Sequence, residues 1–134
     1  MKAAYYLDTS AALKLVKLEA ETPFLEAWLE AQHFPRLISS DFLRTELIGS
    51  ILRFVPEGLQ RAHDLIEQIS FLKIKTEICT QAVMHLGLGL GTLHAIHLAS
   101  ALACSPEIQG LVTYDKRLIE ASLRAGIRPI TPNV

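Results

Sequence analysis

The chain has 134 residues, of which 50% are hydrophobic and 20% are charged, and its formal net charge at pH 7 is −1. This length is typical of one domain, so we expect a single domain over residues 1–134 with an aliphatic core. A charge so close to zero excludes a strongly basic surface that binds nucleic acid without specificity, although it leaves room for a local basic patch.

Short apolar runs and helical periodicity alternate along the chain. Strands are predicted, in chain order, over residues 3–8, 36–39, 71–75, 110–115 and 127–130. Helices are predicted over residues 11–17, 24–32, 42–54, 59–69, 76–86, 92–103 and 116–126. This alternation predicts an α/β fold, a three-layer α/β/α sandwich around a mainly parallel sheet that is buried on both faces.

Several boundaries of these elements carry residues that favour helix ends. Residues with capping side chains precede the first three helices, namely Thr9 or Ser10, Thr22, and Ser40 or Asp41. Gly126 is the predicted C′ residue of the last helix. The segment LGLGLG, residues 86–91, lacks the G-x-G-x-x-G spacing and a leading strand. It therefore predicts a joint between two helices rather than a nucleotide site.

The chain shows no sign of membrane insertion or export. No stretch approaches the roughly 20 apolar residues of a membrane span, and the start MKAAYYLDTS becomes polar too soon for a signal peptide. We therefore expect a cytoplasmic protein with no membrane segment. Cys79 and Cys104 lie far apart in helical segments, which predicts two buried free thiols in a reducing compartment.

Two of the predicted strands end on an aspartate, Asp8 in YYLD and Asp115 in LVTYD. Ligands of parallel α/β sheets bind outside the carboxyl ends of the strands, so we expect these two acids to meet there. Two carboxylates in a half-buried pocket repel each other, and a bound divalent cation removes that cost. The alternative is that each aspartate only caps the helix behind it.

Glu46, in LRTELIGS, is the third acidic candidate. Phe42, Glu46 and Gly49 fall on one stripe of the predicted helix at spacings of four and three. Since core positions flank this stripe, Glu46 is either a solvated edge residue or a ligand that points inward.

The apolar helix TLHAIHLASAL carries His94 and His97 three residues apart. The spacing hints at zinc, but no cysteine accompanies the pair and the H-E-x-x-H motif is absent. Taken singly, each histidine is predicted to be a hydrogen-bonded residue of the core or its edge.

Four segments together, YYLDTSAALKL, RTELIGS, TLHAIHLASAL and LVTYDKRLIEASLRAGI, resemble the PIN-domain ribonucleases, most closely the VapC toxins of type II toxin–antitoxin systems. The resemblance covers nearly the whole chain. It implies an α/β/α sandwich whose acids hold Mg²⁺ or Mn²⁺ at the carboxyl edge of the sheet, where the ion activates water to attack an RNA phosphodiester. By motif, Asp8, Glu46 and Asp115 are the metal-binding acids, and Thr113 is the hydroxyl that orients the metal or its water.

The sequence departs from the family at one catalytic position. Where the family pattern is close to T-L-D-A-I-H-L-A-S-A, this chain has His94 in place of the aspartate, whereas His97 matches the family's own histidine. The exchange removes a negative charge, and imidazole suits Mn²⁺ or Zn²⁺ better than Mg²⁺. Three readings follow: a weakened nuclease, a nuclease with a shifted metal preference, and an inactivated form, natural or made to allow production of a toxic protein.

The resemblance also implies partners. We expect an RNA substrate, a VapB-like antitoxin whose tail covers the acidic pocket by inserting an arginine, and a homodimer. Basic residues beside the motifs are predicted to position RNA phosphates or to contact the antitoxin, and they are Lys14, Lys17, Arg44, Lys116 and Arg117. Arg44 stands out because it is within one helical turn of Glu46, but an ordinary solvated face explains the same residues.

Two other functions compete with the nuclease. The first is a catalytically inactive PIN-fold module that binds antitoxin or RNA, and His94 is the feature that favours it. The second is a signalling domain with a phosphorylated aspartate. The sequence argues against this second function, because no acidic pair lies beside Asp8.

Overall fold

The computed structural model describes residues 2–133 and contains one five-stranded parallel sheet in the order β3-β2-β1-β4-β5. The strands are β1 (Ala4–Leu7), β2 (Arg36–Ser40), β3 (Ile69–Leu72), β4 (Leu111–Val112) and β5 (Pro129–Ile130). The chain runs outward from β1 to β3 and then returns to add β4 and β5 on the other side of β1. The strand order therefore reverses between β1 and β4, and a crevice is expected at such a point.

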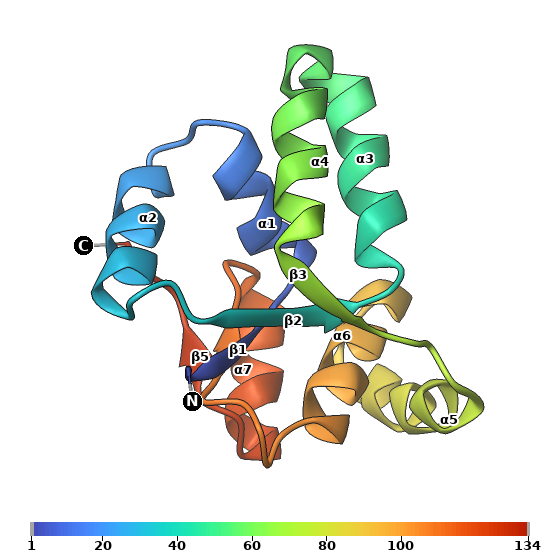
Figure 1. Ribbon diagram of the computed structural model, residues 1–134. Coiled ribbons are helices and arrows are strands. Elements are labelled where there is room, and N and C mark those ends of the chain that lie inside the picture. The colour runs from blue at the N-terminus through green and yellow to red at the C-terminus, as the bar shows by residue number, and fades with distance from the viewer. Residues whose placement is uncertain (1, 134) are drawn as a thin grey trace.

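Helices cover both faces of the sheet (Figure 1), so the predicted three-layer sandwich is confirmed. One layer holds α1 (Thr9–Val16), α2 (Thr22–Ala31), α3 (Leu43–Phe54) and α4 (Leu59–Glu67). The other holds α5 (Thr76–His85), α6 (Thr92–Ala103) and α7 (Lys116–Ala125). Short 3₁₀ turns, η1 (Pro56–Gly58) and η2 (Leu86–Leu88), precede α4 and follow α5. Within residues 2–133, no helix has the length and apolar character needed to cross a bilayer.

Strand β1 explains why the N-terminal apolar run is continuous. Successive side chains of a strand point to opposite faces. Tyr5 and Leu7 pack in the cluster with α1–α4, whereas Ala4 and Tyr6 pack in the cluster with α5–α7, and all four are buried. Because both faces of this strand are covered, no polar alternation appears in its sequence.

Strands β3, β4 and β5 differ from their predicted ranges. The predicted strand 71–75 is in fact β3 at Ile69–Leu72. Its pairing with β2 runs from Leu37↔Ile69 to Ser40↔Leu72 and ends where β2 ends, so the alternating residues 73–75 have no partner. The predicted strands 110–115 and 127–130 shrink to the two paired residues of β4 and of β5.

The predicted N-caps were wrong for the first three helices. Asp8 caps α1, because its side chain accepts a hydrogen bond from the Ala11 N–H. The cap positions of α2 and α3 are occupied by Glu21 and Phe42, and neither side chain makes a capping bond. Thr22 instead donates to the Lys14 carbonyl at 2.7 Å.

The predictions for the last helix end and for the cysteines had mixed outcomes. Gly126 follows α7 with φ +84°, in the left-handed region that favours glycine, as predicted. Residues 86–91 join α5 to α6, also as predicted. Both thiols are free, but only Cys104 is buried, and Cys79 is exposed on α5. The prediction that both thiols are buried was therefore wrong for Cys79.

Gly110 lets the β4 backbone approach β5, and this close approach can be tested. A Cβ at Gly110 would lie 2.8 Å from the Arg128 carbonyl oxygen, which the β4–β5 pairing holds in place. We expect Gly110→Ala to lower the free energy of unfolding by about 1–3 kcal/mol through overpacking. Gly49→Ala is the matched control, because a Cβ at this position inside α3 meets nothing within 4 Å. We expect it to raise stability by about 0.5–1 kcal/mol. Urea denaturation measures both, and a neutral Gly110→Ala would contradict the close approach.

Candidate active site

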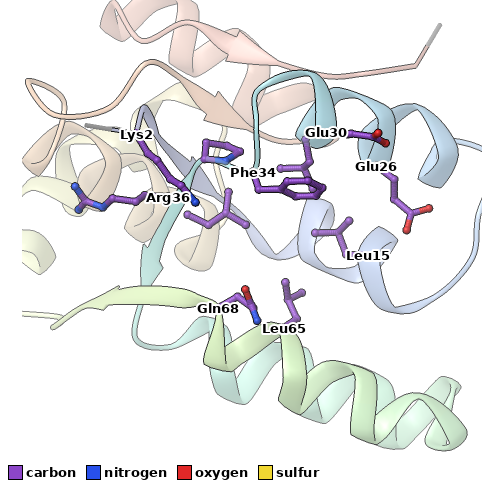
Figure 2. Close-up of a pocket in the computed structure, with 11 residues that line it drawn as sticks. Lys2, Leu15, Glu26, Glu30, Phe34, Arg36, Leu65 and Gln68 are labelled. Carbon is purple, nitrogen blue, oxygen red and sulfur yellow. The ribbon is translucent and has the colours of Figure 1, made fainter.

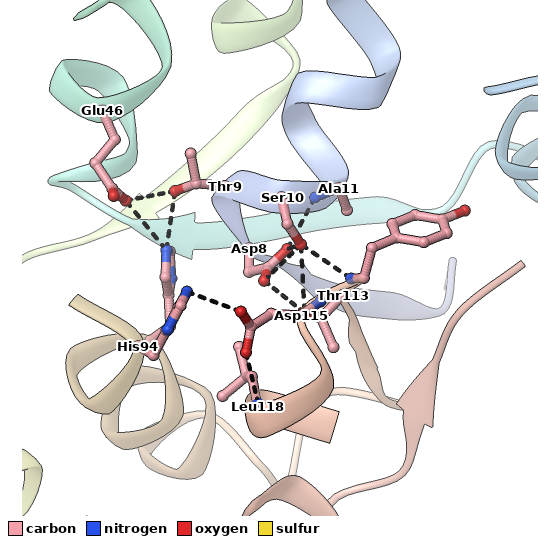
Figure 3. A network of polar contacts seen from close by, with 11 residues as sticks. Asp8, Thr9, Ser10, Ala11, Glu46, His94, Thr113, Asp115 and Leu118 are labelled. Carbon is pink, nitrogen blue, oxygen red and sulfur yellow. Dashed lines mark hydrogen bonds and ion pairs between the residues drawn. The ribbon is translucent and has the colours of Figure 1, made fainter. Parts of the chain in front are cut away.

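A network of polar side chains occupies the carboxyl edge of the sheet at the point where the strand order reverses (Figure 3). Leu7 at the end of β1 pairs with Val112 at the end of β4. The next residues, Asp8 and Thr113, are therefore neighbours, and the Asp8 N–H donates to the Val112 carbonyl at 3.2 Å. The crevice expected at the switch point is thus lined by an acid and a hydroxyl.

The Asp8 carboxylate is fully buried and fully engaged in hydrogen bonds. Its Oδ1 accepts from the Ala11 N–H at 2.9 Å and from Ser10 Oγ at 2.7 Å, and its Oδ2 accepts from Thr113 Oγ1 at 2.5 Å. Ser10 Oγ also accepts from the Tyr114 N–H at 2.9 Å. These bonds connect β1, α1 and the end of β4 around a single carboxylate.

Thr113 links Asp8 to Asp115. Its hydroxyl donates to Asp8 and accepts from the Asp115 N–H at 3.1 Å. Asp115 caps α7, with Oδ1 accepting from the Leu118 N–H at 2.8 Å, while Oδ2 lies 3.5 Å from Nε2 of His94. The His94 side chain is 38% exposed, so this pair lies at the open side of the network.

Glu46, in the first turn of α3, reaches the network from the other side. Its Oε1 accepts from Thr9 Oγ1 at 2.5 Å and lies 3.5 Å from Nε2 of His97. The His97 side chain is only 1% exposed and contacts Thr9 Oγ1 at 3.0 Å and Tyr6 Oη at 2.8 Å. Each of the two histidines of α6 therefore faces one carboxylate.

Burial and hydrogen bonding shift the pKa values of this edge in different directions. Burial raises the pKa of Asp8, even though the hydrogen bonds from Thr113, Ala11 and Ser10 lower it. Partial burial also raises the pKa of Glu46, but bonds from His97 and Thr9 outweigh it, so the net pKa lies below its ordinary value. Burial raises the pKa of Tyr6, so the phenol keeps its proton.

The edge holds all five side chains for which the sequence predicts a catalytic role, namely Asp8, Glu46, His94, Thr113 and Asp115. Both aspartates also cap helices, as the alternative reading predicted, and whether they do only this is untested. Among residues 2–133, no group of three or more His, Cys, Asp or Glu side chains is close enough together to hold a metal ion. The catalytic and metal-binding roles therefore stay predictions.

The sequence predicted the wrong role for Thr9 and Ser10, and it predicted no role for Tyr6. The first two were predicted caps, but their hydroxyls bond to Glu46 and Asp8. Tyr6 bonds to His97 across the sheet and helix layers. The D-T-S sequence after a strand was the available signal for the two hydroxyls. Nothing local identifies Tyr6, because its partner is 91 residues away.

The basic residues near the motifs differ in their surroundings. Lys14 forms ion pairs with Glu21 at 2.9 Å and Glu19 at 3.5 Å. Arg44 forms an ion pair with Asp41 at 3.1 Å, and its guanidinium carbon lies 4.1 Å from the centre of the Phe71 ring, so it leans toward β3. The remaining three, Lys17, Lys116 and Arg117, are exposed.

One cavity lies away from this edge. It has a volume of about 590 Å³ and is lined by residues of α1, α2 and α4 and of the segment that enters β2 (Figure 2). Lys2 and Arg36 contribute positive charge to its lining, and Glu26 and Glu30 of α2 contribute negative charge. Arg36 begins β2, so this cavity opens near the amino end of the sheet, opposite the acids.

The raised pKa of Asp8 predicts a pH dependence of stability in protein free of divalent ions. Between the ordinary value of 3.8 and the higher folded value, the folded state binds more protons than the unfolded state. The contribution of Asp8 to stability is therefore full at acid pH and declines as pH rises through this window. We expect Asp8→Asn to remove this decline. Denaturation from pH 3 to 8 in EDTA measures it, and parallel curves for both proteins would contradict the burial cost.

Comparisons with known proteins agree with this architecture. The model of the PIN domain family matches residues 5–122. The chain is 33% identical to ribonuclease VapC35 of Mycobacterium tuberculosis strain H37Rv over 95% of this chain and 96% of that protein. It is 32% identical to ribonuclease VapC46 of the same strain over 98% and 99% of the two chains.

Solved structures show the same fold at lower identity. VapC20 of Mycobacterium tuberculosis, described as a sarcin–ricin loop cleaving toxin, superposes with a TM-score of 0.73 at 17% identity, covering 92% of this chain and 95% of that one. VapBC-1 from nontypeable Haemophilus influenzae gives a TM-score of 0.71 at 19% identity, covering 98% and 99%. With the family model and the relatives above, these findings establish that the chain belongs to the PIN-domain family, among the VapC ribonucleases.

Proposed function

We propose that the chain is a metal-dependent endoribonuclease toxin of a VapBC-type system, with activity reduced by His94. The observation that carries the proposal is the bridge from Asp8 through Thr113 to Asp115 at the switch point, with Glu46 joined to the same edge by Thr9. Relatives named as ribonucleases along nearly the whole chain support it.

The donors at this edge suit Mg²⁺ or Mn²⁺ by their chemistry. Asp8, Glu46 and Asp115 offer carboxylate oxygens, which both ions accept. A divalent ion supplies a Lewis acid that activates water and offsets negative charge on the phosphate. The raised pKa of Asp8 also means that its buried charge is poorly compensated without an added cation.

The three carboxylates are not assembled around one point. Glu46 is bonded to Thr9, and Asp115 faces His94. Asp8 has both oxygens occupied by hydrogen bonds. Shared binding of one ion therefore requires Glu46 and Asp115 to turn from these partners toward Asp8. His94 opposes this for Asp115, because its Nε2 lies 3.5 Å from Oδ2 of the same carboxylate.

The same pairing supports an alternative, a PIN-fold module that binds antitoxin or RNA without cleaving. In that function, His94 would stay paired with the Asp115 carboxylate, and the edge would bind no ion. The two functions differ in whether the chain cleaves RNA while the pairing is intact.

Cleavage by the unchanged chain, measured beside His94→Asp, decides between these two functions, because the inactive module would cleave RNA only after the substitution. We expect His94→Asp to increase RNA cleavage at least about tenfold in Mg²⁺ or Mn²⁺, the scale typical of metal-site partners, and EDTA to abolish it. A double variant that adds Asp8→Asn serves as the inactive control. Equal rates with and without the substitution would show that His94 is tolerated. If neither protein cleaves a panel of structured and unstructured RNAs, the nuclease proposal is wrong and the binding module stands.

The proposal includes partners and a location. Toxin–antitoxin complexes among the similar structures support a VapB-like antitoxin. We also propose a homodimer, supported by exposed apolar side chains on α3 and α5, namely Leu52, Phe54, Val83 and Met84. A cytoplasmic location would give access to RNA.

Arg44 is the basic residue best suited to contact RNA. It is exposed and stacked on Phe71, which orients its guanidinium while leaving donors for a phosphate. We expect Arg44→Gln to reduce the slope of log Kd against log salt by about one for an RNA oligonucleotide. Arg53→Gln is the matched control, because Arg53 lies over Phe54 in the last turn of the same helix. Equal slopes for the two variants would exclude Arg44 from the interface.

A further inference from the structure

The buried pair of Tyr6 and His97 belongs to the edge of the site, but none of the proposed chemistry uses it. Tyr6 lies on β1 and is fully buried on the face covered by α5–α7. Its Oη accepts from the Ser40 N–H at 3.1 Å and lies 2.8 Å from Nδ1 of His97. The Ser40 N–H can only donate, so the phenol proton is free to point at Nδ1.

This contact and the contact of Nε2 with Thr9, whose own proton goes to Glu46, together assign the tautomer of His97. A nitrogen that accepts a hydrogen bond carries no proton, so neutral His97 must carry its proton on Nε2. Nε2 faces Thr9 Oγ1 at 3.0 Å and Glu46 Oε1 at 3.5 Å. It therefore donates to Thr9, and the Thr9 hydroxyl donates onward to Glu46 at 2.5 Å.

The hydrogen bonds form a chain with a single direction. Each donor points the same way, from the Ser40 N–H through Tyr6, His97 and Thr9 to Glu46 Oε1. Bonds in series polarise one another, and a chain of this direction needs an acceptor at its end. An ionised carboxylate is such an acceptor.

Packing prevents the central imidazole from turning. The ring of His97 meets the Tyr6 ring edge-on with centroids 5.6 Å apart, and the Phe42 ring lies at 4.5 Å. Among the described residues, none donates a hydrogen bond to Oε2 of Glu46. The chain therefore engages one oxygen of Glu46 and leaves the other for a ligand.

We propose that Tyr6 and His97 are positioning residues that hold Glu46 by Oε1 and orient Oε2 toward the reacting groups. The inference deepens the proposed function and rests on it, because the task of Glu46 in cleavage is part of that function. It also separates the two histidines of α6. His97 presents an N–H to the site and cannot ligate a cation through Nε2, whereas His94 has no such anchor.

The tautomer of His97 is the first test, and it does not depend on activity. In the purified chain, ¹⁵N-detected imidazole spectra should assign the proton of His97 to Nε2. Tyr6→Phe should convert His97 to a mixture of tautomers. Tyr5→Phe is the matched control, since it removes a phenol from the same strand whose Oη bonds to Gln32 at 3.2 Å on the other face. A proton on Nδ1 in the unchanged chain would overturn the proposal.

Kinetics form the second test, with either the unchanged chain or His94→Asp, whichever cleaves RNA. We expect Tyr6→Phe to lower kcat by about tenfold, the scale of partners that orient a ligand, and to leave KM unchanged. Tyr5→Phe should alter neither constant. Equal kcat values for the two variants would overturn the positioning role even if the tautomer is as expected.

The two proposals fail in distinguishable ways. If neither the unchanged chain nor His94→Asp cleaves RNA, the proposed function is wrong, and Mn²⁺ affinity replaces kcat as the readout. Mn²⁺ binding followed by electron paramagnetic resonance should then be about tenfold weaker in Tyr6→Phe than in Tyr5→Phe. Equal Mn²⁺ affinities would overturn the positioning role on its own.

Discussion

The organisation of this edge depends on the burial of one carboxylate. Asp8 has no solvent exposure, and a buried charge is tolerated only when it is well hydrogen-bonded. Its partners come from the first turn of α1 and from the residue after β4. Satisfying Asp8 therefore fixes how β1, α1 and β4 meet. The hydrogen bonds do not fully offset the burial, as the raised pKa indicates, so the folded chain retains an attraction for positive charge at this point.

The same two aspartates cap helices and contribute to the polar network at this edge. Asp8 and Asp115 each use an oxygen to cap a helix, which holds the carboxylate at the strand end. The remaining oxygen of each faces the crevice, where Thr113 and His94 contact it. The cap thus determines where the second oxygen of each carboxylate points. The two interpretations of these aspartates, as helix caps and as ligands, are therefore compatible. Each interpretation concerns a different oxygen of the carboxylate.

Much of this could be predicted from sequence where the signal is local. The strand ends identified Asp8 and Asp115, and the apolar runs identified the parallel sheet, because both features follow from burial of a strand on two faces. The sequence did not predict the hydrogen bonds between residues that lie far apart along the chain. Thr9 looks like a cap in isolation, and only α3 packing beside α1 turns its hydroxyl toward Glu46. The range of β3 was misplaced because β2 sets where pairing ends, and alternation alone does not.

The position of His94 is best understood through charge. Three carboxylates lie along this edge without meeting at one point, and an aspartate at position 94 would add a fourth, which would raise their mutual repulsion in the absence of a cation. An imidazole removes that acid and, when protonated, offers Asp115 a positive partner within 3.5 Å. The ion-free edge is thereby made more favourable, while the ion-bound edge loses an oxygen donor. Both changes act in the same direction, so under the proposed function we expect His94 to weaken ion binding even without a change in the backbone.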